Sequence, residues 1–495
     1  MESQHLLAKP APVVSEAKAK QAKKTKASLN IILFTVFIGS AMYTIVLPSM
    51  PAYITQVHAQ AYVLGWLVSA FSAGQFFLSP ALGMWFNARN ALEPLLFSGA
   101  LLVLGNVLYS IAWSKWWLVV SRVIIGMGAA NVSVCRAYAA AVTPVDKRTG
   151  VLSLIAAAQG VGFVVGPAMG AALASVNYKI KVGGSLYPDG EYRINNATAP
   201  GWLSVVLCLI NLLVLALFFT DMSRVPLPMA KRGGEVYDTI DDDDTDVPAK
   251  IPNRPTTPTT PVPDPLPLHL IPARKSCAGV DKTLDLVAIC LAMAIFFCII
   301  SCFGCFETTL SKLLKANYSW GTAKAGILFM SCGVISIFAF LTIKPLGNVI
   351  GDRLVLVVGL GIMIGTGLLC IAYNGGHVPL VQFLVANCIF SIGYPYSSAI
   401  IYALFSKILG GTDQGTMMGL LTSCGSAART LGPLAAGYGY YYGGTNTVYI
   451  VIGGLAALAL VLTLAGWSKL VTYDVLLDRK LAKYRSSRRL VIQSA

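Results

Sequence analysis

The stretch GFVVGPAMG at residues 162–170 sets three glycines and a proline inside a long apolar block. A second stretch of this kind, RTLGPLAAG, occupies residues 429–437, and its Gly432 follows Gly166 by 266 residues. Small residues let membrane helices approach closely, and proline bends a helix. We therefore expect both copies to act where helices move against one another. The residues assigned to this gating role are Gly162, Gly166, Pro167, Gly170, Gly432 and Pro433.

A second motif repeats at nearly the same spacing. The sequence GMWFNAR covers residues 83–89, and GNVIGDR covers residues 347–353, so that the two copies lie 264 residues apart. Two unrelated motifs that recur at almost one offset indicate a duplicated unit. The residues assigned to this loop motif are Gly83, Asn87, Arg89, Gly347, Asp352 and Arg353.

The composition excludes an ordinary soluble protein. Of the 495 residues, 56% are hydrophobic and 12% are charged, which is too few charges to cover the surface of a soluble chain of this length. The apolar residues form blocks of 18 or more, the pattern of membrane-spanning segments. Backbone groups in lipid must bond within their own segment, so we predict an all-α polytopic membrane protein.

The blocks predict twelve transmembrane helices in two six-helix repeats. They fall near 30–55, 62–84, 93–113, 116–142, 149–174, 201–221, 284–310, 322–343, 353–373, 378–406, 414–438 and 446–469. The chain then divides into a basic tail (1–28), a first bundle (29–221), a linker (222–281), a second bundle (282–469) and a basic tail (470–495). The linker is rich in Pro and Thr and is expected to be disordered, either as a spacer or as a docking segment for a partner.

The net charge of +15 comes mainly from the two tails, so it indicates membrane topology and lipid contact rather than nucleic-acid binding. Basic flanks mark the cytosolic side, and an even number of spans places both tails there. The sequons at Asn196 and Asn317 then fall on the opposite side, where glycosylation occurs. A third sequon, at Asn131, lies inside a predicted helix and is not expected to be modified.

The repeated motifs resemble those of the major facilitator superfamily, and the resemblance covers nearly the whole chain. Residues 162–170 resemble its fifth-helix signature, and RVIIGMG at 122–128 resembles its fourth-helix pattern. The resemblance implies two parallel six-helix halves and a transport function. Asn87 departs from the family pattern, in which an acidic residue is usual at this position of the loop.

A narrower resemblance lies in SIGYPYSSAIIYALFSKILGGTDQGTMMGLLTSCGSAARTLGP, residues 391–433. This stretch is similar to the lysosomal branch of the superfamily that is linked to neuronal ceroid lipofuscinosis. The resemblance implies an endolysosomal membrane location and a role in ion or solute handling, with chloride as the proposed ion.

Four charged residues stand within or at the end of predicted helices: Arg122, Arg136, Glu307 and Arg429. A charge at the bilayer centre costs at least about 2.5–3.5 kcal/mol, so each should face a cavity or a partner. We hypothesise that Arg136 and Arg429 attract an anion, and that Glu307 pairs with Arg429 or carries a coupling proton. The alternative is a structural ion pair or a side chain that reaches the interface.

Neutral polar residues provide weaker candidates for substrate contact. Asn131 and Gln159 could contact a solute, and Tyr394 stands beside Pro395, where an unwound helix would expose carbonyl groups. Packing or bonding between helices is the competing interpretation for all three.

Other functional classes find less support in the sequence. The chain holds no P-loop, His-Glu-x-x-His or Gly-x-Ser-x-Gly motif, so we predict that it is not an enzyme and uses no cofactor. Cys298, Cys302 and Cys305 share a helical face without a histidine, which favours packing over metal binding. A receptor or scaffold that kept the fold without transporting remains the alternative function.

The first ten residues, MESQHLLAKP, contain Glu2 four residues before the pair Leu6 and Leu7. This resembles the acidic dileucine signal that sorting adaptor complexes read in cytosolic tails of lysosomal membrane proteins. The expected partners are therefore a small solute or ion, the lipid bilayer and these adaptor complexes. A chance pair is the alternative.

Overall fold

A computed structural model describes residues 12–60, 63–173, 176–181, 191–224, 285–320, 322–371, 378–410 and 414–470. The sorting residues Glu2, Leu6 and Leu7 lie outside the described residues. The same holds for the linker after residue 224 and the tail after residue 470. We call residues 12–224 the N-terminal half and residues 285–470 the C-terminal half.

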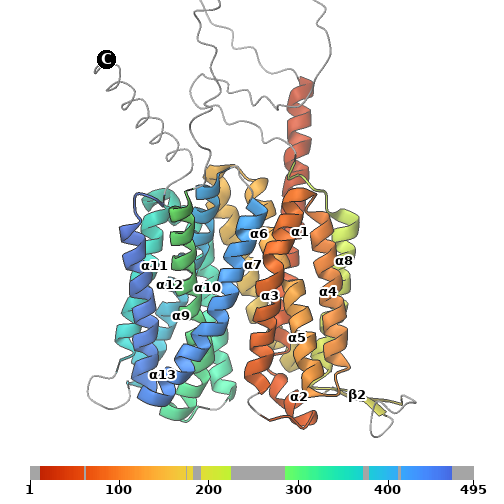
Figure 1. Cartoon of the computed structure of the whole chain (residues 1–495), viewed down its shortest axis with the longest axis vertical. Helices are drawn as coiled ribbons and strands as arrows, with labels where there is room; N and C mark the ends of the chain where they lie inside the picture. Colours follow the sequence, from red (N-terminus) through yellow and green to blue (C-terminus); the bar gives the residue numbers. More distant parts are fainter. Residues whose placement is uncertain are drawn as a thin grey trace, which may run out of the picture. The chain divides into compact units, whose positions relative to one another are not determined.

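The described chain is a bundle of helices with one β-hairpin (Figure 1). The N-terminal half comprises α1 (Pro12–Ile45), α2 (Met50–Gln56), α3 (Val63–Ala88), α4 (Leu92–Ser110), α5 (Lys115–Ala129), α6 (Asn131–Ala141), the 3-10 turn η1 (Val145–Lys147), α7 (Arg148–Ala172), β1 (Asn177–Lys181), β2 (Glu191–Asn195) and α8 (Ala199–Phe218). The C-terminal half comprises α9 (Leu286–Tyr318), α10 (Thr322–Ile350), α11 (Asp352–Leu369), α12 (Leu380–Leu409) and α13 (Gln414–Ala465).

The number of membrane spans agrees with the sequence. Eleven helices of the described residues are long and apolar enough to cross a membrane. The last of them, α13, has 52 residues and contains a non-helical residue, Gly444, with φ of 67°. A straight helix of that length would measure about 78 Å, more than twice the roughly 30 Å of a hydrocarbon core. It is therefore two spans that meet at Gly444, which makes twelve.

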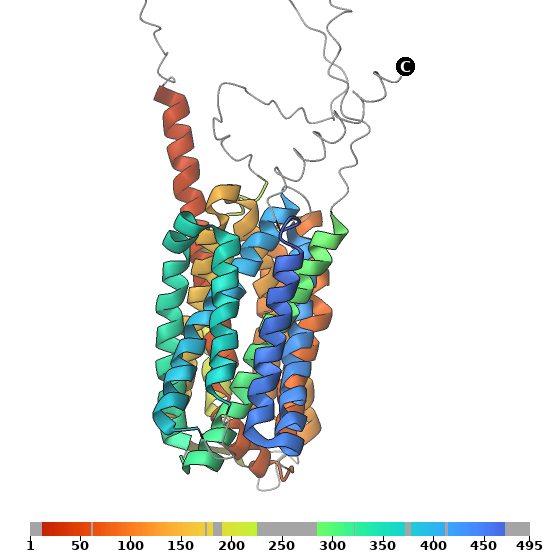
Figure 2. The same ribbon diagram turned by 90° about the vertical axis from the view of Figure 1, so that its left-hand side faces the viewer.

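The first helix differs from the prediction at both ends. It begins at Pro12 rather than near residue 30, because the tail is rich in Ala, Lys and Gln, which favour helix. Figure 2 shows this start of α1 extending beyond the neighbouring helices. The helix also ends at Ile45 instead of residue 55. Pro48 falls in the turn that follows, and the short α2 begins with a proline near its first position.

The predicted fourth span, 116–142, consists of two helices. They are α5 and α6, which meet at Ala130. This junction follows Gly126 and Gly128, where α5 is pressed against its neighbours. A Cβ atom at Gly128 would come within 2.8 Å of both the Leu102 nitrogen and the Ser98 carbonyl oxygen of α4.

The two halves repeat one packing arrangement. In the first, glycines of α7 lie against the backbone of α1: a Cβ at Gly162 would stand 2.6 Å from the Phe37 carbonyl oxygen. In the second, Gly432 of α13 lies against α9 in the same way, 2.7 Å from the Ser301 carbonyl oxygen by the same measure. The glycines of each repeated Gly-Pro stretch thus pack against a helix of their own half, and Val164 of the first stretch also packs against Gly333 of the other half.

The two ends of the bundle differ in character. We call the end where α1 starts, with Lys20, Lys23, Lys24 and Lys26, the basic side. We call the opposite end, where β1 and β2 pair antiparallel between α7 and α8, the hairpin side (Figure 1). Large apolar side chains face outward along the helices between these ends, among them Phe77, Leu217, Phe338 and Val349. An apolar outer face is what a lipid environment requires.

Candidate functional site

The two halves meet most closely along α3 and α13. From the basic side inward, Gly83 lies against Gly415, where an added methyl group would collide with the carbonyl oxygen. The Ser423 hydroxyl donates to the Phe76 carbonyl at 2.6 Å. The deepest of these contacts is the Ser426 hydroxyl, which donates to Gln75 Oε1 at 3.1 Å.

Asn87 fastens the loop after α3 to the first turn of α13. Its Oδ1 accepts the Gly415 N–H at 2.9 Å, and its Nδ2 donates to Thr416 Oγ1 at 2.9 Å. The first N–H groups of a helix have no partner within that helix. A neutral amide therefore makes both bonds here, one as acceptor and one as donor, where the family pattern has a carboxylate. We call this contact the Asn87 latch.

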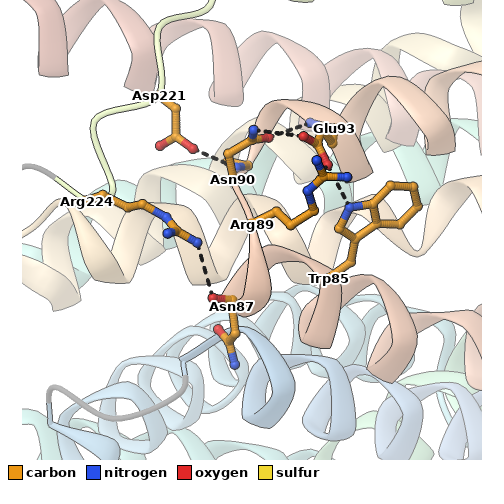
Figure 3. A network of polar contacts seen from close by, with 8 residues as sticks. Trp85, Asn87, Arg89, Asn90, Glu93, Asp221 and Arg224 are labelled. Carbon is orange, nitrogen blue, oxygen red and sulfur yellow. Dashed lines mark hydrogen bonds and ion pairs between the residues drawn. The ribbon is translucent and has the colours of Figure 1, made fainter.

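The rest of this loop is held by its own half (Figure 3). Glu93 accepts from Arg89 at 3.2 Å and from the indole N–H of Trp85 at 3.0 Å, and it also bonds Asn90. Arg224 donates to the Asn87 carbonyl at 3.4 Å. The backbone that carries the Asn87 side chain is thus held within the N-terminal half, while its amide reaches the other half.

The second copy of the loop forms the equivalent contact, from the C-terminal half to the start of α7 in the N-terminal half. Asp352, at the first position of α11, accepts from the hydroxyl of Thr149 in the first turn of α7 at 2.9 Å. Lys407 of α12 pairs with the same carboxylate. We call this contact the Asp352 latch. Arg353 is turned away from the other half, because it donates to the Trp467 carbonyl and stacks over that indole ring.

The hydrogen bonds between the halves stop near mid-helix. Among the described residues, all of them lie between the basic side and the level of Gln75 and Ser426. Arg429 follows Ser426 by three residues and so stands about one helical turn further toward the hairpin side. The bundle is therefore fastened on its basic side, and Arg429 lies just past the last fastening.

Arg136 is buried and makes two side-chain hydrogen bonds. Its Nη1 donates to the Tyr402 hydroxyl and its Nη2 to Gln159 Oε1, both at 2.8 Å. Its guanidinium also lies 3.8 Å from the centroid of the Tyr402 ring. Arg136 and Gln159, two separate candidates from the sequence, are thus brought together by α6 and α7 of the N-terminal half, and Arg136 also bonds Tyr402 of the C-terminal half.

Arg429 and Glu307, unlike Arg136, lack hydrogen-bond partners among the described residues. Both side chains are half-buried, and within the described part of the chain neither has a hydrogen bond or an ion pair. They interact electrostatically without touching. Tyr394, Tyr43 and Tyr402 also lie within electrostatic range of Arg429. These groups come from α1, α9, α12 and α13, and thus from both halves. Together with Arg136 we call them the charged cluster.

Arg122 stands apart, inside the N-terminal half. Its side chain is fully buried, its Nε donates to the Leu67 carbonyl at 3.5 Å, and its Nη2 has no partner in the described residues. The guanidinium lies over the rings of Phe71 and Tyr43, at 5.2 and 5.8 Å from their centroids. Asn131, at the start of α6, is buried as well.

Sequence reasoning missed Tyr43 and Tyr402. A tyrosine in an apolar block looks like core packing, and no spacing sets these two apart from the other 19 tyrosines of the chain. Their relation to Arg136 and Arg429 depends on helices that are far apart in sequence. Tyr394 was selected for the neighbouring proline, whereas the structure brings its hydroxyl into the charged cluster.

The two sequons differ in exposure. Asn196 is exposed in the turn between β2 and α8. Asn317 is half-buried near the end of α9, where its Nδ2 donates to Thr445 Oγ1 at 3.1 Å. Both lie on the hairpin side, as expected, and their glycosylation stays a prediction. In the described part of the chain, no group of three His, Cys, Asp or Glu side chains is placed to hold a metal ion.

Comparison with known proteins places the chain among relatives of the same architecture. Major facilitator superfamily domain-containing protein 8 from Xenopus laevis is 28% identical over 93% of this chain and 94% of its own length. An SPX domain-containing membrane protein of Arabidopsis thaliana is 29% identical over 46% of this chain, but over 31% of its own length.

Two solved structures share the fold. The human organic anion transporter MFSD10 superposes with a TM-score of 0.65 at 18% identity, over 89% of this chain and 99% of the other. The transporter FucP in its outward conformation gives a TM-score of 0.60 at 14% identity, over 88% and 97% of the two chains. The profile described as Major Facilitator Superfamily matches residues 32–346 and 291–480. With twelve helices in two repeated halves, the chain belongs to the major facilitator superfamily of membrane transporters.

Proposed function

We propose that this chain moves a small anion, with chloride as the first candidate, across the endolysosomal membrane. The observation that carries the proposal is the position of Arg429. It is a half-buried guanidinium past the last hydrogen bond between the halves, with no hydrogen bond or ion pair in the described residues. An unpaired charge inside a membrane protein is costly, so it should find its partner in a solute.

The mechanism we propose is alternating access. The basic side is fastened by the Asn87 latch and the Asp352 latch, and the charged cluster lies on the other side of those contacts. An anion would reach Arg429 from the hairpin side, and release on the basic side would require both latches to open. One structural neighbour, human MFSD10, is an organic anion transporter, which is consistent with an anionic solute.

The test is anion flux in liposomes that contain the purified protein. Replacing Arg429 by Gln removes the free positive charge, so chloride flux should fall at least tenfold. Arg136→Gln should also lower it, because Tyr402 and Gln159 lose the donor that holds them. The matched control is Lys147→Gln, an exposed cation on the basic side in the turn between α6 and α7, which should keep wild-type flux. Unchanged flux and ion selectivity in Arg429→Gln would overturn the proposal.

The location rests on the tails. We propose that the basic side faces the cytosol, since Lys20, Lys23, Lys24 and Lys26 flank the first span there. Glu2, Leu6 and Leu7 would then be exposed to sorting adaptors. Joint replacement of Leu6 and Leu7 by Ala should shift the protein from lysosomes to the cell surface in microscopy. In cells with this variant at the surface, an antibody should reach an amino-terminal tag only after the plasma membrane is permeabilised. If the variant stays in lysosomes, this pair does not direct sorting.

A further inference from the structure

Arg148 is a buried arginine that bonds both halves of the molecule on the basic side. It is the first residue of α7, and it is 5% exposed. Its Nε donates at 3.3 Å to the carbonyl of Thr143, which lies just past the end of α6 in its own half. Its Nη1 donates to the carbonyls of Ser406 and Gly410 in the other half, at 2.8 and 3.0 Å. The guanidinium therefore joins the start of α7 to the end of α12.

The two carbonyls lie at the end of a long helix. α12 ends at Leu409, so Ser406 belongs to its last turn and Gly410 follows it directly, and both are buried. The last carbonyls of a helix have no partner within that helix, and its aligned peptide dipoles give this end a partial negative charge. A cation is favoured there, and a hydrogen bond from a charged donor is stronger than one from a neutral donor.

The first turn of α7 is enclosed by three helices of the other half. Arg148 bonds the end of α12, and the hydroxyl of Thr149 donates to Asp352 of α11. A Cβ atom at Gly150 would stand 2.8 Å from Cδ of Lys344, which belongs to α10. All three residues of α7 are buried. Water therefore reaches the Arg148 guanidinium only when these helices draw back.

The residue of the second half that is equivalent to Arg148 is Gln414. It is the first residue of α13, and 414 − 148 = 266 is the offset that also separates the two Gly-Pro stretches. Its Nε2 donates to the same two carbonyls, of Ser406 and Gly410, at 3.3 and 2.8 Å. Gln414 and these carbonyls all belong to the C-terminal half. When the halves separate, the carbonyls keep Gln414 as a donor, whereas Arg148 loses both of its Nη1 bonds.

We propose that Arg148 is a third latch of the basic side and that it sets how often the two halves separate there. It adds two bonds from a charged donor to the two of the Asn87 latch and the one of the Asp352 latch. The charge is permanent, because arginine stays protonated in proteins. This inference rests on the proposed alternating access and is independent of which solute is carried.

The backbone amide of Gly415 reports the separation of the halves without any solute. Its N–H donates to Asn87 Oδ1 of the other half, so this bond breaks when the halves part. An amide then exchanges its hydrogen with solvent at a rate that follows the open population. The measurement is hydrogen–deuterium exchange, resolved to single residues, on the full-length protein in lipid nanodiscs. Arg148→Gln should raise the Gly415 rate about tenfold, the factor expected for the loss of a charge-assisted hydrogen bond.

Two controls distinguish separation of the halves from local loosening. The amides of residues 405–408 bond within α12, beside the Arg148 contact, and should exchange as in the wild type. Lys147→Gln removes the same charge from the exposed neighbour of Arg148 and should leave the Gly415 rate unchanged. Arg148→Lys keeps the charge, but its single nitrogen cannot bond Thr143 and α12 together as the guanidinium does. Its Gly415 rate should lie between those of the wild type and Arg148→Gln.

The outcomes keep this proposal apart from anion transport. A wild-type Gly415 rate in Arg148→Gln, at an unchanged thermal midpoint, would overturn the latch. Equally faster exchange at residues 405–408 would also overturn it, because the variant would then loosen α12 instead of separating the halves. If Arg148→Gln does not fold, a wild-type Gly415 rate in Arg148→Lys has the same meaning. Wild-type chloride flux in Arg429→Gln would refute the anion and leave the latch standing, since the exchange experiment contains no solute.

Discussion

At the residue scale, Glu307 is the one acidic side chain of the charged cluster. The groups that face it are Arg429 of α13, Tyr43 of α1 and Tyr394 of α12. An ionised carboxylate repels an anion that approaches Arg429, whereas a protonated one does not. Protonation would therefore strengthen anion binding and move a proton together with the anion.

This predicts a pH dependence that a single variant removes. In the wild type, the KM for chloride should be several-fold lower at pH 5 than at pH 7 on the hairpin side. In Glu307→Gln, the KM should be low at both pH values, because the side chain has lost its charge. The measurement is chloride flux into liposomes with the two pH values set outside. A variant that keeps the wild-type pH dependence would exclude Glu307 as the coupling group.

The same scale shows how far sequence reasoning reaches into the site. Arg136, Glu307 and Arg429 could be found because a charge in an apolar block is expensive and therefore conspicuous. Tyr43 and Tyr402 could not be found in this way, because tyrosine is common in apolar helices and carries no charge that would set it apart. The sequence also could not distinguish the engaged Arg136 from the unpaired Arg429, since that depends on Gln159 and Tyr402, which lie on other helices.

At the element scale, helix number follows from the apolar blocks, whereas helix ends depend on local chemistry. α1 starts at Pro12 because residues that favour helix continue the span into the polar tail, and hydropathy cannot register that. The break between α5 and α6 at Ala130 was equally hidden, since residues 115–141 are apolar enough on average to be identified as a single span. Hydropathy measures the cost of leaving lipid and carries no information on where a helix bends.

The Gly-Pro stretches of α7 and α13 illustrate the same limit. Close helix packing at Gly162 and Gly432 was predictable, because small residues permit it. The partner helix was not, and it proved to be α1 or α9 of the same half. Glycine contacts between the halves include Gly83 near the end of α3, which lies against Gly415 at the start of α13, and Gly333 of α10, which lies against Val164 of α7. The gating role of the Gly-Pro stretches stays a prediction.

At the scale of the whole molecule, the two latches occupy equivalent positions in the two repeated halves but differ in chemistry. The Asn87 latch is neutral and relies on two hydrogen bonds to the start of α13. The Asp352 latch holds a carboxylate between Thr149 and Lys407. Asp352 and Lys407 both belong to the C-terminal half, so this ion pair stays intact when the halves separate. Opening the basic side therefore breaks one hydrogen bond at the Asp352 latch, from Thr149, and two at the Asn87 latch.

If the halves rock against one another, fixing the Asn87 latch must stop transport. The double variant Asn87→Cys with Thr416→Cys places two thiols where the side chains now meet at 2.9 Å. Oxidation should lock the basic side shut and lower chloride flux at least tenfold, and a reductant should restore it. The matched control is Asn317→Cys with Thr445→Cys, also an asparagine–threonine pair, at 3.1 Å, but within the C-terminal half. Its cross-link should leave flux unchanged, because α9 and α13 move together. Chloride flux that continues through the fully cross-linked Asn87 pair would mean a pore that needs no rocking, and so a channel on this scaffold instead of a carrier.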